Sequence, residues 1–184
     1  RDRILFAEGG DRWEVLVAEI SSFQLEAIKA FRPWRSVLLN ITEDHLDRYS
    51  QYSDYIEAKS RIFANQTPED IAILNKDDPA VMELAEKIDA RKILFSLSEK
   101  IDEGTFVNGQ TIIHRLGGKE EDYSLSKVFL KGIHNVENMM AAITSARVSG
   151  CSKKAIQTAL DQFEGLEHRL ELVQEIRGVR FYND

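Results

Sequence analysis

The sequence contains a single cysteine, Cys151, among its 184 residues. One thiol cannot close an internal disulfide, and it cannot supply the several sulfur ligands of a cysteine-rich zinc site. Such sparse use of cysteine fits a reducing compartment. We therefore predict a cytoplasmic protein.

The chain also lacks long apolar segments and an excess of basic residues. No apolar run approaches the roughly 20 residues that a membrane-spanning helix needs, and the charged first residues do not resemble a signal peptide. The 24 basic and 31 acidic residues give a net charge of −7, without a basic stripe. We expect neither membrane insertion nor nucleic-acid binding.

The two ends lack the features of natural termini. The first residue is Arg1 rather than methionine, and the chain stops directly after a strand-like run. We therefore expect a fragment that is truncated at both ends. Hydrophobic residues make up 43% of it, which is enough for a sizeable core.

The first half of the sequence alternates between strand and helix patterns. This order predicts an α/β fold with a mostly parallel sheet flanked by crossover helices. Ser21 with Gln24 matches a capping box at the start of a helix, and Asp78-Pro79 matches an N-cap followed by a proline at the first helical position. The expected strands are 13–18, 36–41, 71–75 and 92–96; the expected helices start at Ser21, at Asp54 after a Ser53 cap, and at Pro79.

The second half begins with a hairpin pattern around Asn108-Gly109, which predicts a small antiparallel patch beside the parallel sheet. Helical patterns follow, with Gly150 and Ser152 as stop and cap. The remaining expectations are a strand within 123–130, helices over 135–149 and 152–163, and a terminal hairpin over 170–176 and 179–182.

Polar residues follow the first two predicted strands. Glu19 ends the first strand, where it is either a solvated carboxylate or a ligand for Mg²⁺, which prefers carboxylate and phosphate oxygens. Ser21 and Ser22 are helix caps that also suit an anion. His45 lies in an acidic loop after the second strand and is either simply exposed or in contact with metal or substrate. Ligands bind at the carboxyl ends of adjacent parallel strands, so the two clusters are expected to share one site.

Lys59 lies in the middle of an apolar helical stripe formed by Tyr55, Ile56, Ile62 and Phe63. One interpretation is that its stem is buried while the ammonium group reaches water. The other is a functional amine, which in its neutral form captures CO₂ as a carbamate and becomes an anionic metal ligand. The residues alone leave both interpretations open.

Three further positions are candidates. Asn135 and Asn138 stand at the start of a helix, where Asn135 also suits an ordinary N-cap. Arg169 follows a linker glycine and is either a surface residue or a phosphate contact. Asp184 is the final residue, and no pattern around it indicates a role.

Five ordered motifs resemble those of the Mur ligases, and together they cover nearly the whole chain. Residues 19–26 and 40–49 specifically resemble the branch of that family that adds D-glutamate. The motifs are Glu-Ile-Ser-Ser-Phe-Gln-Leu-Glu at 19–26, Asn-Ile-Thr-Glu-Asp-His-Leu-Asp-Arg-Tyr at 40–49, Ala-Lys-Ser-Arg-Ile-Phe at 58–63, Gly-Ile-His-Asn-Val-Glu-Asn at 132–138 and His-Arg-Leu-Glu at 168–171.

The resemblance implies a bacterial ATP-dependent ligase of three domains. Residues 1–166 would be most of the central ATP-binding domain, and 167–184 the hinge and first hairpin of the C-terminal domain. The implied metal ligands for two Mg²⁺ ions are Glu19, His45 and carbamylated Lys59, which are also the implied catalytic residues. The resemblance further places Ser21 and His45 near the substrate, and Asn135, Asn138, Arg169 and Asp184 around the nucleotide.

The implied reaction has two steps. The carboxylate of UDP-N-acetylmuramoyl-L-alanine attacks the γ-phosphate of ATP, and the amine of D-glutamate then displaces phosphate from the acyl phosphate. The family's Gly-x-x-Gly-Lys-Ser/Thr phosphate loop is absent from these 184 residues, so we expect the fragment alone to be inactive. The alternatives are a folylpolyglutamate synthase-like ligase and a non-catalytic α/β binding module.

Overall fold

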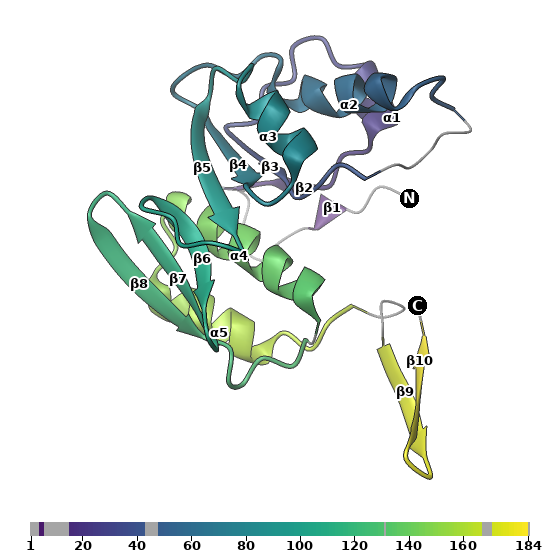
Figure 1. Ribbon diagram of the computed structural model, residues 1–184, viewed down its shortest axis with the longest axis vertical. Helices are drawn as coiled ribbons and strands as arrows, with labels where there is room; N and C mark the ends of the chain where they lie inside the picture. The colour runs from purple at the N-terminus through teal and green to yellow at the C-terminus, as the bar shows by residue number, and fades with distance from the viewer. Residues whose placement is uncertain (1–3, 6–14, 43–47, 131, 167–170, 184) are drawn as a thin grey trace, which may run out of the picture.

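The computed structural model describes residues 4–5, 15–42, 48–130, 132–166 and 171–183. Its main feature is a six-stranded sheet with the order β3-β4-β5-β6-β7-β8 (Figure 1). The pairings from β3 to β6 are parallel, and β6, β7 and β8 pair antiparallel. The predicted combination of a parallel sheet with an antiparallel patch is therefore confirmed. The strands are β3 (Arg35–Leu38), β4 (Ile71–Asn75), β5 (Arg91–Ser96), β6 (Gly104–Asn108), β7 (Thr111–Leu116) and β8 (Lys119–Ser124).

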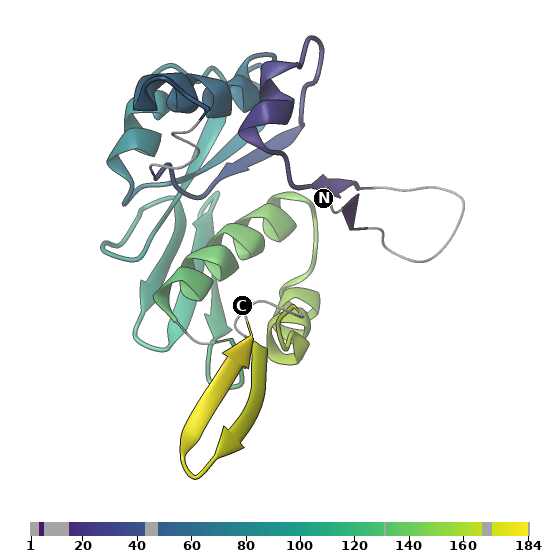
Figure 2. The same cartoon turned by 90° about the vertical axis from the view of Figure 1, so that its right-hand side faces the viewer.

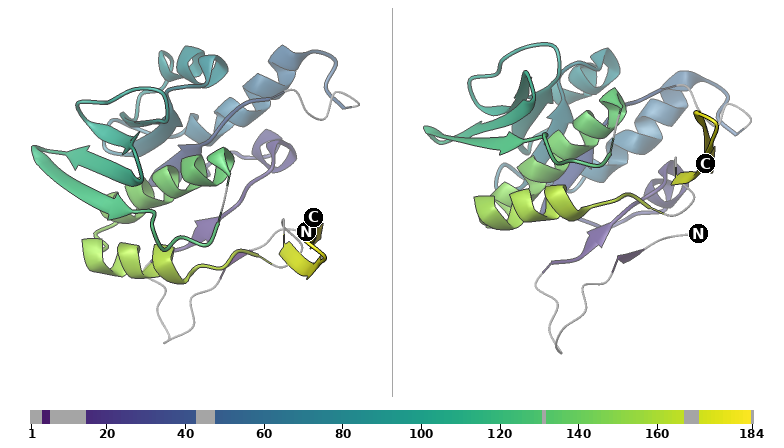
Figure 3. Two further views of the ribbon diagram at one scale, coloured as in Figure 1. Left: turned by 60° about the horizontal axis from the view of Figure 1, so that its bottom comes forward. Right: turned by 90° about the horizontal axis from the view of Figure 1, so that it is seen from below.

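Helices cover both faces of this sheet because the side chains of a strand alternate between its faces. In β4, Leu74 belongs to a cluster with residues of α2 and α3, whereas Ile73 belongs to a cluster with residues of α4 and α5. Both side chains are completely buried. Figure 3 shows α4 and α5 side by side. The helices are α1 (Ser22–Glu26), α2 (Tyr52–Ser60) with a 3-10 turn η1 (Arg61–Phe63), α3 (Pro79–Ala85), α4 (Ile133–Val148) and α5 (Lys153–Gln162).

The predicted first strand is wrong in its place and its burial. Within 15–18, only β2 (Val17–Ala18) is a strand, and it pairs antiparallel with β1 (Ile4–Leu5) outside the main sheet. Val17 is 65% exposed. Apolar composition indicates that a segment favours burial, but it does not name the strand that would pair with it. Glu19 consequently does not follow a strand adjacent to β3.

Several predicted boundaries also need correction. The helix that begins at Ser21 ends after one and a half turns at Glu26, although its capping box with Gln24 is present. Gln51, not Ser53, is the N-cap of α2, and its backbone N–H donates to the carboxylate of Asp54 at 3.1 Å. Strand β8 lies earlier than expected. Helix α4 begins two residues earlier than predicted, after Gly132, so Asn135 is inside the helix rather than its cap.

The terminal hairpin is confirmed as β9 (Glu171–Ile176) and β10 (Val179–Asn183). Its turn places Arg177 at φ 49° and Gly178 at φ 81°, and glycine takes such left-handed angles at no steric cost. Figure 2 shows the hairpin extending away from the main sheet. Apolar residues on it remain exposed, including Val173 and Phe181. None of the helices in the described parts of the chain is long and apolar enough to cross a membrane.

A buried polar network lies where α4 crosses β6 and β7. The Thr144 hydroxyl donates to the carbonyl of Met140 over 2.7 Å, so the 2.6 Å bond from Thr105 to Thr144 uses the Thr105 proton. Nδ1 of His114, 2.8 Å from Thr105 Oγ1, must then be the donor in that contact. This order assigns the Nδ1–H tautomer to the neutral ring.

The first prediction concerns the pH dependence of folding. Burial lowers the pKa of His114, and the charge of Arg147 lowers it further, while Glu121 opposes the change. The unfolded chain therefore binds the imidazole proton more tightly than the folded chain does. Stability from the neutral ring is fully present above the unfolded pKa of about 6.5 and is lost as the pH falls through the lowered folded pKa.

We expect the melting temperature of the chain to decrease as the pH is lowered from 7.5 to 5.0. The variant His114→Gln, which cannot titrate but offers Thr105 a polar partner, should show a shallower decrease. Thermal unfolding followed by circular dichroism checks this. Equal slopes for the two proteins would contradict the assignment.

Candidate functional site

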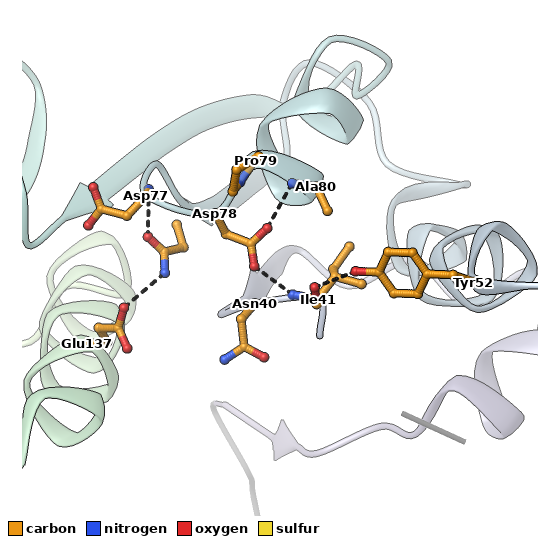
Figure 4. A pocket seen from close by; sticks show the side chains of 9 residues that line it. Asn40, Ile41, Tyr52, Asp77, Asp78, Pro79, Ala80 and Glu137 are labelled. Atoms are coloured by element: carbon orange, nitrogen blue, oxygen red, sulfur yellow. Dashed lines mark hydrogen bonds between the residues drawn. The ribbon is translucent and has the colours of Figure 1, made fainter. Parts of the chain in front are cut away.

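The carboxyl end of β4 continues into a turn at residues 75–78 that contacts several neighbouring elements. The carboxylate of Asp78 accepts hydrogen bonds from the backbone N–H of Ala80 at 2.9 Å and of Val81 at 3.1 Å, which caps α3. Its other oxygen accepts from the N–H of Ile41 at 2.8 Å (Figure 4). One side chain thus connects the start of α3 with the chain that follows β3.

Asp77 makes the matching connection to β5. Its carboxylate accepts from Ser96 Oγ at 2.6 Å and from the N–H of Leu97 at 2.6 Å, and it also contacts the Ser98 hydroxyl. Burial opposes the charge, but these hydrogen bonds outweigh it and lower the pKa of Asp77. Asp77 is therefore a charged acceptor that anchors the end of β5.

Asn75 connects the same turn to α4. It is 4% exposed, and its Oδ1 accepts from the N–H of Asp77 at 2.9 Å. Its amide nitrogen donates to Oε1 of Glu137 at 3.3 Å. The 75–78 turn therefore touches the ends of β3 and β5 and the starts of α3 and α4.

A cavity of about 400 Å³ lies beside this turn, at the carboxyl ends of β3 and β4 (Figure 4). Tyr52 closes one side of it and donates from its hydroxyl to the carbonyl of Ile41 at 2.6 Å. In the sequence, Asp78 is recognisable only as a helix cap, and Asn40 and Ile41 only as part of a motif. The sequence signal for Asn75 and Asp77 is the run of polar residues that ends the buried strand 71–75. The lining residues are Asn40, Ile41, Tyr52, Asn75, Asp77, Asp78, Pro79, Ala80 and Glu137.

A second connection joins the segment after Glu19 to the segment after His45. Glu26 at the end of α1 accepts from the hydroxyl of Tyr49 at 2.6 Å and from Arg48 at 2.7 Å. The Tyr49 hydrogen bond, followed by that of Arg48, lowers the pKa of Glu26. The rings of Phe23 and Tyr49 are also stacked, with centroids 6.1 Å apart. Glu26 and Phe23 of the first predicted motif therefore lie beside Arg48 and Tyr49 of the second, although the strands β2 and β3 are not neighbours.

Lys59 continues this cluster on α2. Its ammonium group lies 5.1 Å from the centroid of the Tyr55 ring, and Tyr55 lies 5.4 Å from Tyr49. Lys59 is half-buried, in agreement with its position on an apolar stripe. The favourable contact between an ammonium group and an aromatic face fits the unmodified amine. Carbamylation of Lys59 remains a prediction.

The other predicted metal and substrate ligands are placed only in part. Glu19 and Ser21 are exposed, and Ser21 caps α1. His45, Arg169 and Asp184 lie outside the residues that the structure describes. Within the described ranges, no group of three or more His, Cys, Asp or Glu side chains is arranged to hold a metal ion. The metal assignment therefore depends on an oxygen ligand from Lys59 and on His45.

Asn135 and Asn138 line a different cavity, of about 340 Å³, between α4 and α5. Its remaining walls are apolar. The two amides stand at i and i+3 on one helix face. Their contact with a nucleotide stays a prediction. The lining residues are Val128, Leu130, Asn135, Asn138, Met139, Ala142, Ile143, Ala146, Ile156, Ala159, Leu160 and Phe163.

Comparison with known proteins shows the family to which the chain belongs. Residues 4–146 match the model of the Mur ligase middle domain, and the chain belongs to that family. More particularly, it is 47% identical over 175 residues to the UDP-N-acetylmuramoylalanine--D-glutamate ligase of Geotalea uraniireducens, covering 95% of this chain. It is 48% identical over 172 residues to the ligase of the same name from Syntrophotalea carbinolica. The chain spans 39% and 38% of those two relatives.

Solved structures agree on the fold. A crystal structure of MurF from Acinetobacter baumannii has a TM-score of 0.65 at 23% identity, and the match covers 85% of this chain and 34% of that one. A pseudomurein peptide ligase from Methanothermus fervidus has a TM-score of 0.60 at 17% identity, covering 76% and 36%. At these identities the likeness supports the architecture alone.

The second prediction tests the 75–78 turn. Asp78→Ala removes a helix cap, worth about 1 kcal/mol, and the acceptor for Ile41, worth about 1 kcal/mol more. We expect a loss of about 2 kcal/mol in the free energy of unfolding, measured with urea on the 184-residue chain. Asp78→Asn keeps one acceptor oxygen and should lose about half as much. An Asp78→Ala variant as stable as the wild type would show that the turn does not connect these elements.

Proposed function

We propose that this chain is the ATP-binding middle part of a cytoplasmic ligase that adds D-glutamate to UDP-N-acetylmuramoyl-L-alanine in peptidoglycan synthesis. The names of the relatives and the family of the chain support this assignment. They favour it over the folylpolyglutamate synthase-like alternative and over a binding module without catalysis. We assign residues 1–166 to the central domain and 167–184 to the hinge and the first hairpin of a following domain.

The observation that carries the ATP assignment is the cavity between α4 and α5. A purine base needs apolar walls for its faces and a few placed polar groups for its edge. An asparagine amide offers a donor and an acceptor together, which matches the N6 and N7 edge of adenine. Asn135 and Asn138 provide two such amides beside Met139 and Ala142. We assign the adenine to this cavity, and Arg169 and Asp184 to the phosphates and ribose.

The acceptor carboxylate and the γ-phosphate of ATP are both anionic and must approach each other. Two Mg²⁺ ions would supply the charge neutralisation between them. We assign their ligands to Glu19, His45 and the carbamate form of Lys59. Glu19 is exposed and therefore accessible to such an ion. Ser21 and His45 are assigned to orienting the substrate that ends in L-alanine.

Lys59 lies where such a carbamate would be useful. Its helix contacts α1, which follows Glu19 directly in sequence, through the aromatic side chains described above. An ammonium group there would repel metal ions, whereas a carbamate would bind them. The assigned chemistry therefore requires the charge of the Lys59 side chain to change from positive to negative.

The 184 residues contain no Gly-x-x-Gly-Lys-Ser/Thr loop to supply backbone N–H groups to the nucleotide phosphates. We therefore expect this chain by itself to show no ATP hydrolysis and no ligation. An assay of phosphate release with UDP-N-acetylmuramoyl-L-alanine, D-glutamate and ATP checks this on the purified chain. Turnover by the chain would refute this expectation.

The third prediction concerns Lys59 in the longer ligase that we propose contains this chain. Intact-mass and peptide analysis under bicarbonate should show an increment of about 44 Da, the mass of CO₂, on Lys59. Lys59→Arg keeps a cation but cannot form the carbamate, and we expect kcat to fall by about 100-fold or more. As a matched control, Lys153→Arg changes an exposed lysine on α5 and should leave kcat unchanged. Full activity of Lys59→Arg would exclude the carbamate.

A further inference from the structure

The first turn of α4, residues 133–136, has neither a side-chain cap from its N-cap residue nor a fully buried side chain. Its N-cap is Gly132 at φ 99°, which offers no side-chain cap. A Cβ at Gly132 would lie 2.7 Å from the ring of His134, so a capping side chain would not fit there without movement. Ile133 is 70% exposed, and Val136 packs against the core while only partly buried, so the fully buried residues of the helix begin at Met139. Helix ends with few buried contacts open more readily than helix centres.

The first two turns of α4 carry the two amides assigned to the adenine. Successive residues of an α-helix are separated by about 100° around its axis. Asn135 and Asn138 therefore share one side, which lines the cavity toward α5, and Glu137 points to the other side. Glu137 lines the cavity at the 75–78 turn instead. The start of α4 therefore separates the two cavities.

The contact on the Glu137 side is well defined. Asn75 is buried, and the bond from the N–H of Asp77 to its Oδ1 fixes which way its amide faces. Its Nδ2 consequently points to Oε1 of Glu137, 3.3 Å away. Asp77 in turn is held by Ser96 and Leu97 at the end of β5. A chain of hydrogen bonds thus fixes the position of Glu137 relative to the carboxyl edge of the sheet.

We propose that Asn75 and Glu137 are positioning residues that hold the first two turns of α4 so that Asn135 and Asn138 present their amides to the nucleotide base. Neither positioning residue touches the base, since both lie on the opposite side of the helix. This inference rests on the proposed ATP site. Without the link, the start of α4 keeps the apolar contact of Val136 but loses this hydrogen bond to the sheet, and the two amides are oriented less tightly.

The experiment uses the longer ligase and removes the hydrogen-bond donor and the acceptor in separate variants. Asn75→Asp places two carboxylates opposite each other, and Glu137→Ala removes the acceptor. Each should raise KM for ATP about fivefold to tenfold, as the loss of one hydrogen bond and its orientation predicts, while kcat changes less than twofold. Calorimetric titration with a non-hydrolysable ATP analogue should show the same loss of affinity.

Two rescue variants separate positioning from charge and from general destabilisation. Glu137→Gln keeps an acceptor oxygen for Asn75 and should restore KM relative to Glu137→Ala. The double variant Asn75→Asp with Glu137→Gln reverses the direction of the hydrogen bond and should bind ATP better than Asn75→Asp alone. Asp122→Asn, which breaks an exposed pair with Lys153, controls for a distant change. Melting temperatures identify any variant that does not fold, in which case the Glu137→Ala and Glu137→Gln pair decides alone.

The outcomes distinguish this inference from the function on which it rests. If the wild-type ligase does not bind the ATP analogue, both the ATP site and the positioning link are wrong. If the wild type binds and Glu137→Ala binds equally well, the link alone is overturned. A loss in Glu137→Ala that Glu137→Gln does not recover would likewise overturn it, since a charge effect would then explain the result.

Discussion

The arrangement of this protein depends on hydrogen bonds made by one short turn, at residues 75–78. A parallel sheet ends in separate loops, and no ladder of backbone hydrogen bonds connects those loops to one another. Here, the side chains of Asp77 and Asp78 make that connection, to Leu97 after β5 and to Ile41 after β3. The lowered pKa of Asp77 agrees with a carboxylate that stays charged because its donors outweigh the cost of its burial. The cavity at this edge has a defined shape because its walls are bonded through that turn.

Much of the architecture follows from local patterns in the sequence. Asp78-Pro79 and Asn108-Gly109 each favour one local backbone geometry, and the structure has a helix start and a hairpin at those positions. Patterns that require knowledge of a distant partner were less informative. The apolar run before Glu19 predicted a buried strand, whereas the described part of it pairs only with Ile4–Leu5. Likewise, the pair of Asn75 and Glu137 is separated by 62 positions, and neither residue belongs to a local motif that predicts the contact.

The candidate site shows the same division. The motifs indicated which residues belong together, and the structure shows how some of them meet. The segments after Glu19 and after His45 are joined by Glu26, Tyr49 and Arg48 rather than by adjacent strands. Short α1 makes this possible, because it ends at Glu26 and presents that carboxylate to Tyr49. The aromatic cluster then extends to Lys59 on α2. Two predicted motifs and one predicted lysine thus meet in one region. The contacts that join them could not be predicted from the periodicity of each segment.

The placement of Asn135 inside α4 has a consequence for how a nucleotide would be held. As an N-cap, Asn135 would accept a hydrogen bond from a backbone N–H of the first helical turn through its side chain. With Gly132 as the N-cap instead, Asn135 lines the cavity beside Asn138. The helix gives up a stabilising cap at this end, which is worth about 1 kcal/mol. A bond from another element is then a physical replacement for the missing cap, and Asn75 of β4 provides it by donating to Glu137 of the helix.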